Sequence, residues 1–164
     1  SAARVSAVSP LWVMVTTSAP ASGTLAMQLI YLKAGQLISN ITIASATTAA
    51  GTPTNYFFAL YDVNRNLLAQ SANQTTTAWA ANTVKTLAMT SAYRVTASGP
   101  YYIGYFMTAT TVATLKGGTA RTGGQLAGSA PIIYGTSTTG LTTALPATAA
   151  AITSATASIY AAVS

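Results

Sequence analysis

The residue types that most often do chemistry in proteins are nearly absent from this chain. Asp62 is its only acidic side chain, and it has neither histidine nor cysteine. These types supply most general bases, metal ligands and activated nucleophiles. One carboxylate cannot form the pair that glycosidases and aspartic proteases use. Ser-His-Asp and Cys-His arrangements and zinc sites of thiolates and imidazoles are excluded as well. We therefore expect no catalytic residue, no metal and no cofactor, and a protein that acts by shape and contact.

One oxygen-rich run resembles the first half of a calcium loop. Asp62, Asn64 and Asn66 alternate as calcium ligands would, but the sixth position is Leu67 instead of glycine. The twelfth position is Asn73, where a calcium loop has a bidentate glutamate. Asp and Asn side chains also bond nearby backbone amides in turns. We expect residues 62–66 to form a hairpin turn.

A glycine-rich segment at 116–131 predicts a long loop. It lacks the Gly-Lys-Ser/Thr ending of a phosphate-binding loop, so phosphate binding is not expected. A loop on a rigid β scaffold can instead contact a partner. The candidate ligand or partner contacts in this segment are Lys116, Gly117, Gly118, Arg121, Gly123 and Gly124.

The aromatic side chains allow two interpretations. Tyr101, Tyr102, Tyr105 and Phe106 form a dense group, whereas Trp79 stands alone beside a loop. Carbohydrate-binding sandwiches stack sugars on exposed rings, so Trp79 and the tyrosines are candidate contacts. Alternate residues of a strand point inward, however, and most of these rings are expected in the core.

The net charge of +6 does not predict nucleic-acid binding. Phosphate binding requires several basic residues on one surface, and the seven basic residues here are spread along the chain. The positive net charge reflects missing acidic residues more than selected basic ones. These basic residues are Arg4, Lys33, Arg65, Lys85, Arg94, Lys116 and Arg121.

Length and composition predict a single folded domain over residues 1–164. Charged residues make up 5%, against about 25% in an average globular protein. Mean hydropathy is +0.45, but no apolar run is long enough for a membrane span, and the N-terminus is too weakly apolar for a signal peptide. Residues 122–164 carry no charged side chain. We expect this neutral segment to lie against something.

Apolar residues alternate at period two, which predicts strands. We expect an all-β fold, an antiparallel jelly-roll-like β-sandwich of about eight to ten short strands. We expect residues 1–20 to form an N-terminal arm or the first strand. Alanine-rich stretches at 47–50 and 78–81 are not expected to be helical, and 147–151 forms at most one turn. The expected strands are 11–17, 25–33, 37–44, 55–63, 67–71, 84–89, 100–109, 112–115, 132–134 and 157–163.

Several phrases, spread over 25–164, resemble a β-sandwich domain in virion proteins of actinobacterial tailed phages. The phrases are LIYLKAG at 29–35, NYFFALYD at 55–62, NRNLLA at 64–69, TAWAANTVKTL at 77–87, GPYYIG at 99–104, GLTTALP at 140–146 and SIYA at 158–161. The resemblance implies a minor tail protein or another virion structural protein, with no catalytic residues. Its location would be the virion, assembled in the host cytoplasm.

Two functions from different classes follow from this resemblance. A structural virion protein, at a tail tip or as a capsid decoration, would assemble as a homo-oligomer or with other virion proteins, because interface cores are depleted of charge. A receptor-binding module would instead recognise a host-envelope glycan or protein, and would expose Trp79 or the 116–128 segment. A secreted bacterial adhesin is less expected, because no export signal is visible.

Overall fold

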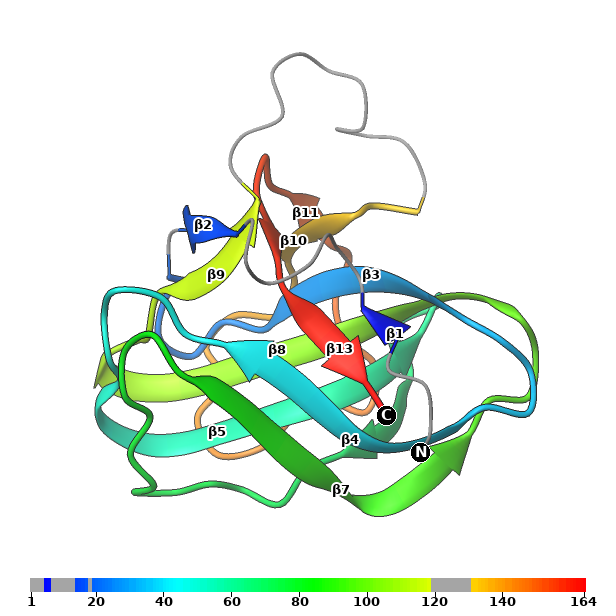
Figure 1. Cartoon of the computed structure of the whole chain (residues 1–164), viewed down its shortest axis with the longest axis horizontal. Helices are drawn as coiled ribbons and strands as arrows, with labels where there is room; N and C mark the ends of the chain where they lie inside the picture. Colours follow the sequence, from blue (N-terminus) through cyan, green and yellow to red (C-terminus); the bar gives the residue numbers. More distant parts are fainter. Residues whose placement is uncertain (1–4, 7–13, 18, 119–130) are drawn as a thin grey trace.

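The computed structural model describes residues 5–6, 14–17, 19–118 and 131–164, and the part that it describes is all-β (Figure 1). Its strands form three antiparallel sheets. The largest sheet has six strands, in the order β11 (Thr153–Ser154), β10 (Tyr134–Thr136), β3 (Ala26–Leu32), β8 (Gly99–Thr111), β5 (Gly51–Asp62) and β6 (Leu67–Gln70). The described residues contain no helix that could cross a membrane.

Two smaller sheets complete the fold. A four-stranded sheet has the order β1 (Val5–Ser6), β13 (Ala161–Val163), β4 (Leu37–Ala44) and β7 (Val84–Arg94). A three-stranded sheet has the order β12 (Ser158–Ile159), β9 (Leu115–Gly118) and β2 (Val15–Thr17). The thirteen strands in the described residues exceed the eight to ten expected, because several have only two or three residues.

The two larger sheets pack face to face as a β-sandwich (Figure 1). Ile41 and Ile43 of β4 and Leu87 of β7 share one buried cluster with Phe58 of β5 and Ile103 of β8. On β7 the inward residues alternate with exposed ones, which is the pattern of a strand with one face in water. The predicted sandwich is therefore confirmed, and alternation was the correct signal for it.

The six-stranded sheet is apolar on both faces, so its outer face also requires a cover. Residues 137–152, orange in Figure 1, provide it. Leu25 N donates to Thr138 O at 2.9 Å, and the Tyr61 hydroxyl donates to Pro146 O at 3.2 Å. The expectation that the neutral C-terminal segment lies against something is confirmed for these residues, and what they cover is the chain's own sheet. The outer-face cluster contains Leu25, Met27, Leu29, Phe57, Ala59, Tyr61, Tyr102, Phe106 and Ala149, against which Leu141, Leu145 and Ile152 pack.

The long alternating strands were predicted closely, and the short ones were not. The prediction 37–44 coincides with β4, and 84–89 and 100–109 lie inside β7 and β8. The prediction 112–115 was wrong, because β8 ends at Thr111 and β9 begins only at Leu115. The strand predicted at 132–134 lies at Tyr134–Thr136 instead, and 157–163 divides into β12 and β13 on different sheets. Of the expected strand 11–17, residues 11–13 lie outside the described residues. None of the three alanine-rich stretches is helical.

Candidate functional site

Trp79 lies in the core, with 1% of its surface exposed. Its ring contacts Tyr56, Phe58 and Tyr105 at centroid distances of 6.2, 5.6 and 6.0 Å. The interpretation of Trp79 as an exposed ligand contact was therefore wrong, because its ring belongs to the main buried cluster of the sandwich. Tyr101, Tyr102, Tyr105 and Phe106 are buried as well, as the core interpretation predicted.

The start of the predicted glycine-rich loop is strand, which corrects the expectation for Lys116, Gly117 and Gly118. They belong to β9, which pairs with β2 on one side and β12 on the other. A Cβ atom on Gly117 would overlap the carbonyl oxygen of Ser158, so glycine allows the two backbones to approach. Arg121, Gly123 and Gly124 lie outside the described residues.

The hairpin turn predicted at residues 62–66 is present, between β5 and β6. The Arg65 amide donates to Asp62 O at 3.0 Å, and the Asp62 amide donates to Asn66 O at 3.0 Å. The Asp62 carboxylate accepts two further bonds, from the Asn66 amide at 2.8 Å and from Asn66 Nδ2 at 2.9 Å. The chain's single carboxylate side chain therefore closes this turn, as turn chemistry predicts.

Arg65 occupies an unusual backbone position in the hairpin. Its φ of 69° is left-handed, where a three-residue hairpin loop normally has glycine. The residue also connects the hairpin to the C-terminal segment. Arg65 O accepts the Ala149 amide at 2.9 Å, and Arg65 Nε donates to Ala149 O at 3.2 Å. The hairpin thus holds one end of the segment that covers the six-stranded sheet.

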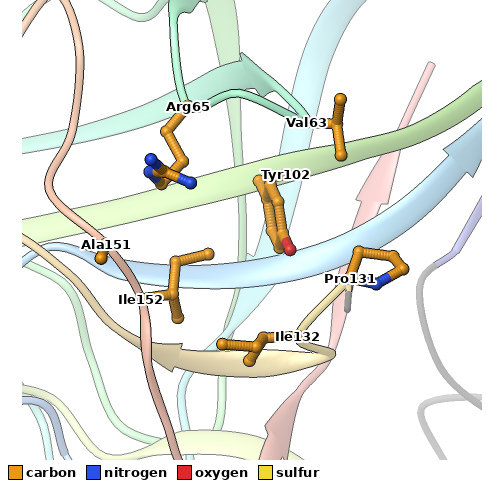
Figure 2. Close-up of a pocket in the computed structure, with 7 residues that line it drawn as sticks. All are labelled: Val63, Arg65, Tyr102, Pro131, Ile132, Ala151 and Ile152. Atoms are coloured by element: carbon orange, nitrogen blue, oxygen red, sulfur yellow. The ribbon is translucent and has the colours of Figure 1, made fainter. Parts of the chain in front are cut away.

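A pocket of about 380 Å³ opens beside the hairpin, where the cover of the six-stranded sheet ends (Figure 2). Val63 and Arg65 line one side, Pro131 and Ile132 line the opposite side, and Tyr102 of β8 lies between them. Ala151 and Ile152 complete the wall. Six of these seven residues have apolar or aromatic side chains, and Arg65 supplies the only charge.

The electrostatics of the pocket suit binding of an anion. Burial raises the pKa of the Tyr102 hydroxyl above its usual value, and the Arg65 charge and the Ile132 backbone amide partly oppose that rise. Tyr102 is therefore neutral at physiological pH and keeps its proton. No side chain lining the pocket is acidic. Among the lining side chains the pocket has one cation and one hydroxyl, an arrangement that can hold an anionic ligand.

Sequence reasoning missed this site, because Arg65 and Tyr102 lie on different elements and only strand pairing brings them together. One local signal was available. Arg65 follows Asn64 in a predicted turn, at a position where a three-residue hairpin loop normally has glycine.

No protein-family model, curated protein or solved structure matches this chain. What the chain does must therefore be inferred from its own residues.

Proposed function

We propose that this chain is a non-enzymatic structural protein of a phage virion, as a minor tail or capsid-surface component. It acts by assembling with its own copies or with neighbouring virion proteins, in particles formed in the host cytoplasm. The phrases that resemble virion β-sandwich domains support the virion part of this proposal. We also propose a jelly-roll-like connectivity. The chain crosses between the two larger sheets from β3 to β4, β4 to β5, β6 to β7 and β7 to β8, which supports this connectivity.

The observation that carries the assembly proposal is the outward face of β7. This strand is the last in its sheet, and its outward residues are exposed and uncharged up to Thr90. Val84 is 49% exposed, and the side chains of Thr86, Ala88 and Thr90 continue the same face. An exposed, uncharged face on the last strand of a sheet is a favourable surface for protein association.

Light scattering after size-exclusion chromatography tests the assembly. The wild-type chain should associate as its concentration rises, and Ala88→Arg should shift it towards monomer, because a buried charge without a partner opposes association. Thr76→Arg, on an exposed loop, adds the same charge away from the face and should leave association unchanged. A wild-type chain that stays monomeric at every concentration would count against the proposal. Electron microscopy of intact particles that carry the chain tests the virion location.

A receptor-binding module for a host-envelope glycan or protein is the second candidate. The pocket beside Arg65 favours it, and Tyr31 lies exposed near Tyr102 on the same face, with 63% of its surface accessible. Trp79 no longer supports this candidate. A glycan array with wild type and Arg65→Gly tests it: envelope sugars retained by wild type and lost by the variant would favour receptor binding.

A further inference from the structure

The pocket beside the hairpin contains a cation without an anionic partner. The bond from Arg65 Nε to Ala149 O, 3.2 Å long, is the only hydrogen bond of this guanidinium among the described residues. Asp62, the one acidic side chain, is already bonded twice to Asn66. Arginine presents its donors in a planar fork that matches a carboxylate. Both Nη groups of Arg65 are therefore free to bind an anion from outside the chain.

The backbone at Arg65 is left-handed, as it is at Thr52 and Asn82. With φ at 69°, the residue adopts a conformation that glycine accepts without strain and arginine does not. Strained positions of this kind concentrate at functional sites. Glycine would close the same turn, but the arginine side chain makes two contributions that glycine would not. One contribution is the bond to Ala149, and the other is the positive charge at the pocket wall.

The remaining walls specify the body of the ligand. Val63, Pro131, Ile132 and Ile152 present apolar surface, and the volume of about 380 Å³ lies within the usual range of small-molecule sites. Tyr102 adds its aromatic ring and a protonated hydroxyl. Arg65 and Tyr102 have the only polar side chains among the seven lining residues. An apolar body with a single anionic group satisfies both the walls and Arg65.

We propose that this pocket binds an organic carboxylate, with its charged group on Arg65 and its apolar body against Ile132 and Ile152. Two sources share this chemistry: a free aromatic or branched acid, and the C-terminal carboxylate of a peptide that ends in an apolar residue. The pocket and the outward face of β7 are separate surfaces. The carboxylate proposal and the assembly proposal can therefore each fail without the other.

Chemical-shift titration of the labelled chain with matched probes tests the site. Phenylacetate represents the free acid, phenylacetamide is its neutral counterpart, and N-acetylphenylalanine represents a peptide terminus. Phenylacetate should perturb residues around Arg65 and Tyr102 in a saturable way, and the amide should bind at least about tenfold more weakly, because it lacks the charge. The acid that binds more tightly, phenylacetate or N-acetylphenylalanine, identifies the source.

Variants at Arg65 distinguish the effect of its positive charge on binding from the effect of the pocket's shape. Arg65→Gly should keep the hairpin and remove the preference for carboxylate over amide, and Arg65→Lys should retain part of that preference. Thermal unfolding of each variant confirms that it is folded. Two results with the wild-type chain alone would overturn the proposal. One is equal binding of phenylacetate and phenylacetamide, and the other is no saturable binding of any carboxylate probe. A carboxylate preference that survives in Arg65→Gly would overturn it as well.

Discussion

Arg65 and Ala149 bind each other twice. The Ala149 amide donates to Arg65 O at 2.9 Å, and Arg65 Nε donates to Ala149 O at 3.2 Å. The first bond joins two backbones and the second requires the arginine side chain. This reciprocal contact fixes the hairpin after β5 to the segment that covers the outer face of the six-stranded sheet, and it places one wall of the pocket.

The left-handed backbone of Arg65 predicts that glycine will be tolerated there better than alanine. Both Arg65→Gly and Arg65→Ala lose the side-chain bond to Ala149, but glycine also relieves the strain at φ 69°. Arg65→Gly should therefore be more stable than Arg65→Ala by about 1 kcal/mol. Urea unfolding measures the difference.

The same pair of substitutions at Asn64 is the control, since Asn64 is not among the residues with positive φ. There alanine should equal or exceed glycine in stability, because glycine gains conformational freedom in the unfolded chain. Equal stabilities of the two Arg65 variants would contradict the strain argument.

Two neighbouring glycines of β9 should respond differently to alanine. A Cβ atom on Gly117 would meet the backbone of Ser158 and Ile159, whereas one on Gly118 would meet only the Ser158 hydroxyl, at 2.9 Å. Backbone cannot move without separating β9 from β12, but a hydroxyl can rotate away. We expect Gly117→Ala to cost about 2 kcal/mol or more and Gly118→Ala less than about 1 kcal/mol, from the usual cost of overpacking.

Denaturant unfolding of the two variants, compared with wild type, checks this prediction. A loss of similar size for both would show that the close approach of β9 and β12 is not what requires glycine at position 117.

Removal of the Trp79 ring should destabilise the fold strongly. Trp79 is 1% exposed and packs against three aromatic rings, so Trp79→Ala should cost about 3–5 kcal/mol by leaving a cavity. Its Nε1 is buried without a hydrogen-bond partner among the described residues. Trp79→Phe removes that unsatisfied donor together with part of the ring, so it should cost much less than alanine.

Urea unfolding of both variants provides the measurement. A Trp79→Ala variant as stable as the wild type would mean that the ring lies at the surface and would restore the sugar-binding interpretation.

Buried tyrosines predict a loss of stability at alkaline pH. Burial raises the pKa of Tyr134, and that of Tyr56, from 10.0 to about 12 in the folded chain. Above pH 10 the unfolded chain releases these protons more readily than the folded chain does, so stability is complete below pH 10 and falls as the pH rises towards 12. For Tyr134 the slope approaches about 1.4 kcal/mol per pH unit. Burial lowers the pKa of Lys85, which acts in the opposite direction.

The free energy of unfolding at pH 9, 10 and 11 measures this effect, and tyrosinate absorbance shows whether ionisation accompanies unfolding. Tyr134→Phe removes one contributing group, so its stability should decline less steeply over the same range. A stability that does not change between pH 9 and pH 11 would be contrary to this prediction.

The long strands could be predicted from the sequence because their signal is local. Alternation at Ile41 and Ile43, and the aromatic run that includes Phe58, mark β4 and β5 whatever the rest of the chain does. The two-residue strands β11 and β12 have no such periodicity. They pair only because another strand passes beside them, so no local pattern could locate them.

The candidate site, like the strands, could be predicted only where its signal is local. Asp62 and the residues after it carry turn chemistry in their own side chains, and the hairpin was predicted from them. Trp79 was misplaced, because an isolated ring in a loop gives no local sign of which face it will contact. The pocket could not be predicted at all, since Arg65, Tyr102 and Ile152 come from three distant parts of the chain.

The sequence by itself determined the all-β class, the strands that alternate and the absence of histidine, cysteine and any acidic side chain besides Asp62, because composition and periodicity are local properties. Only the tertiary structure decided what the neutral C-terminal segment covers and where an unpaired cation meets an apolar wall. Both depend on the six-stranded sheet having two apolar faces, one closed by the opposing sheet and the other by residues 137–152, whose cover ends beside Arg65.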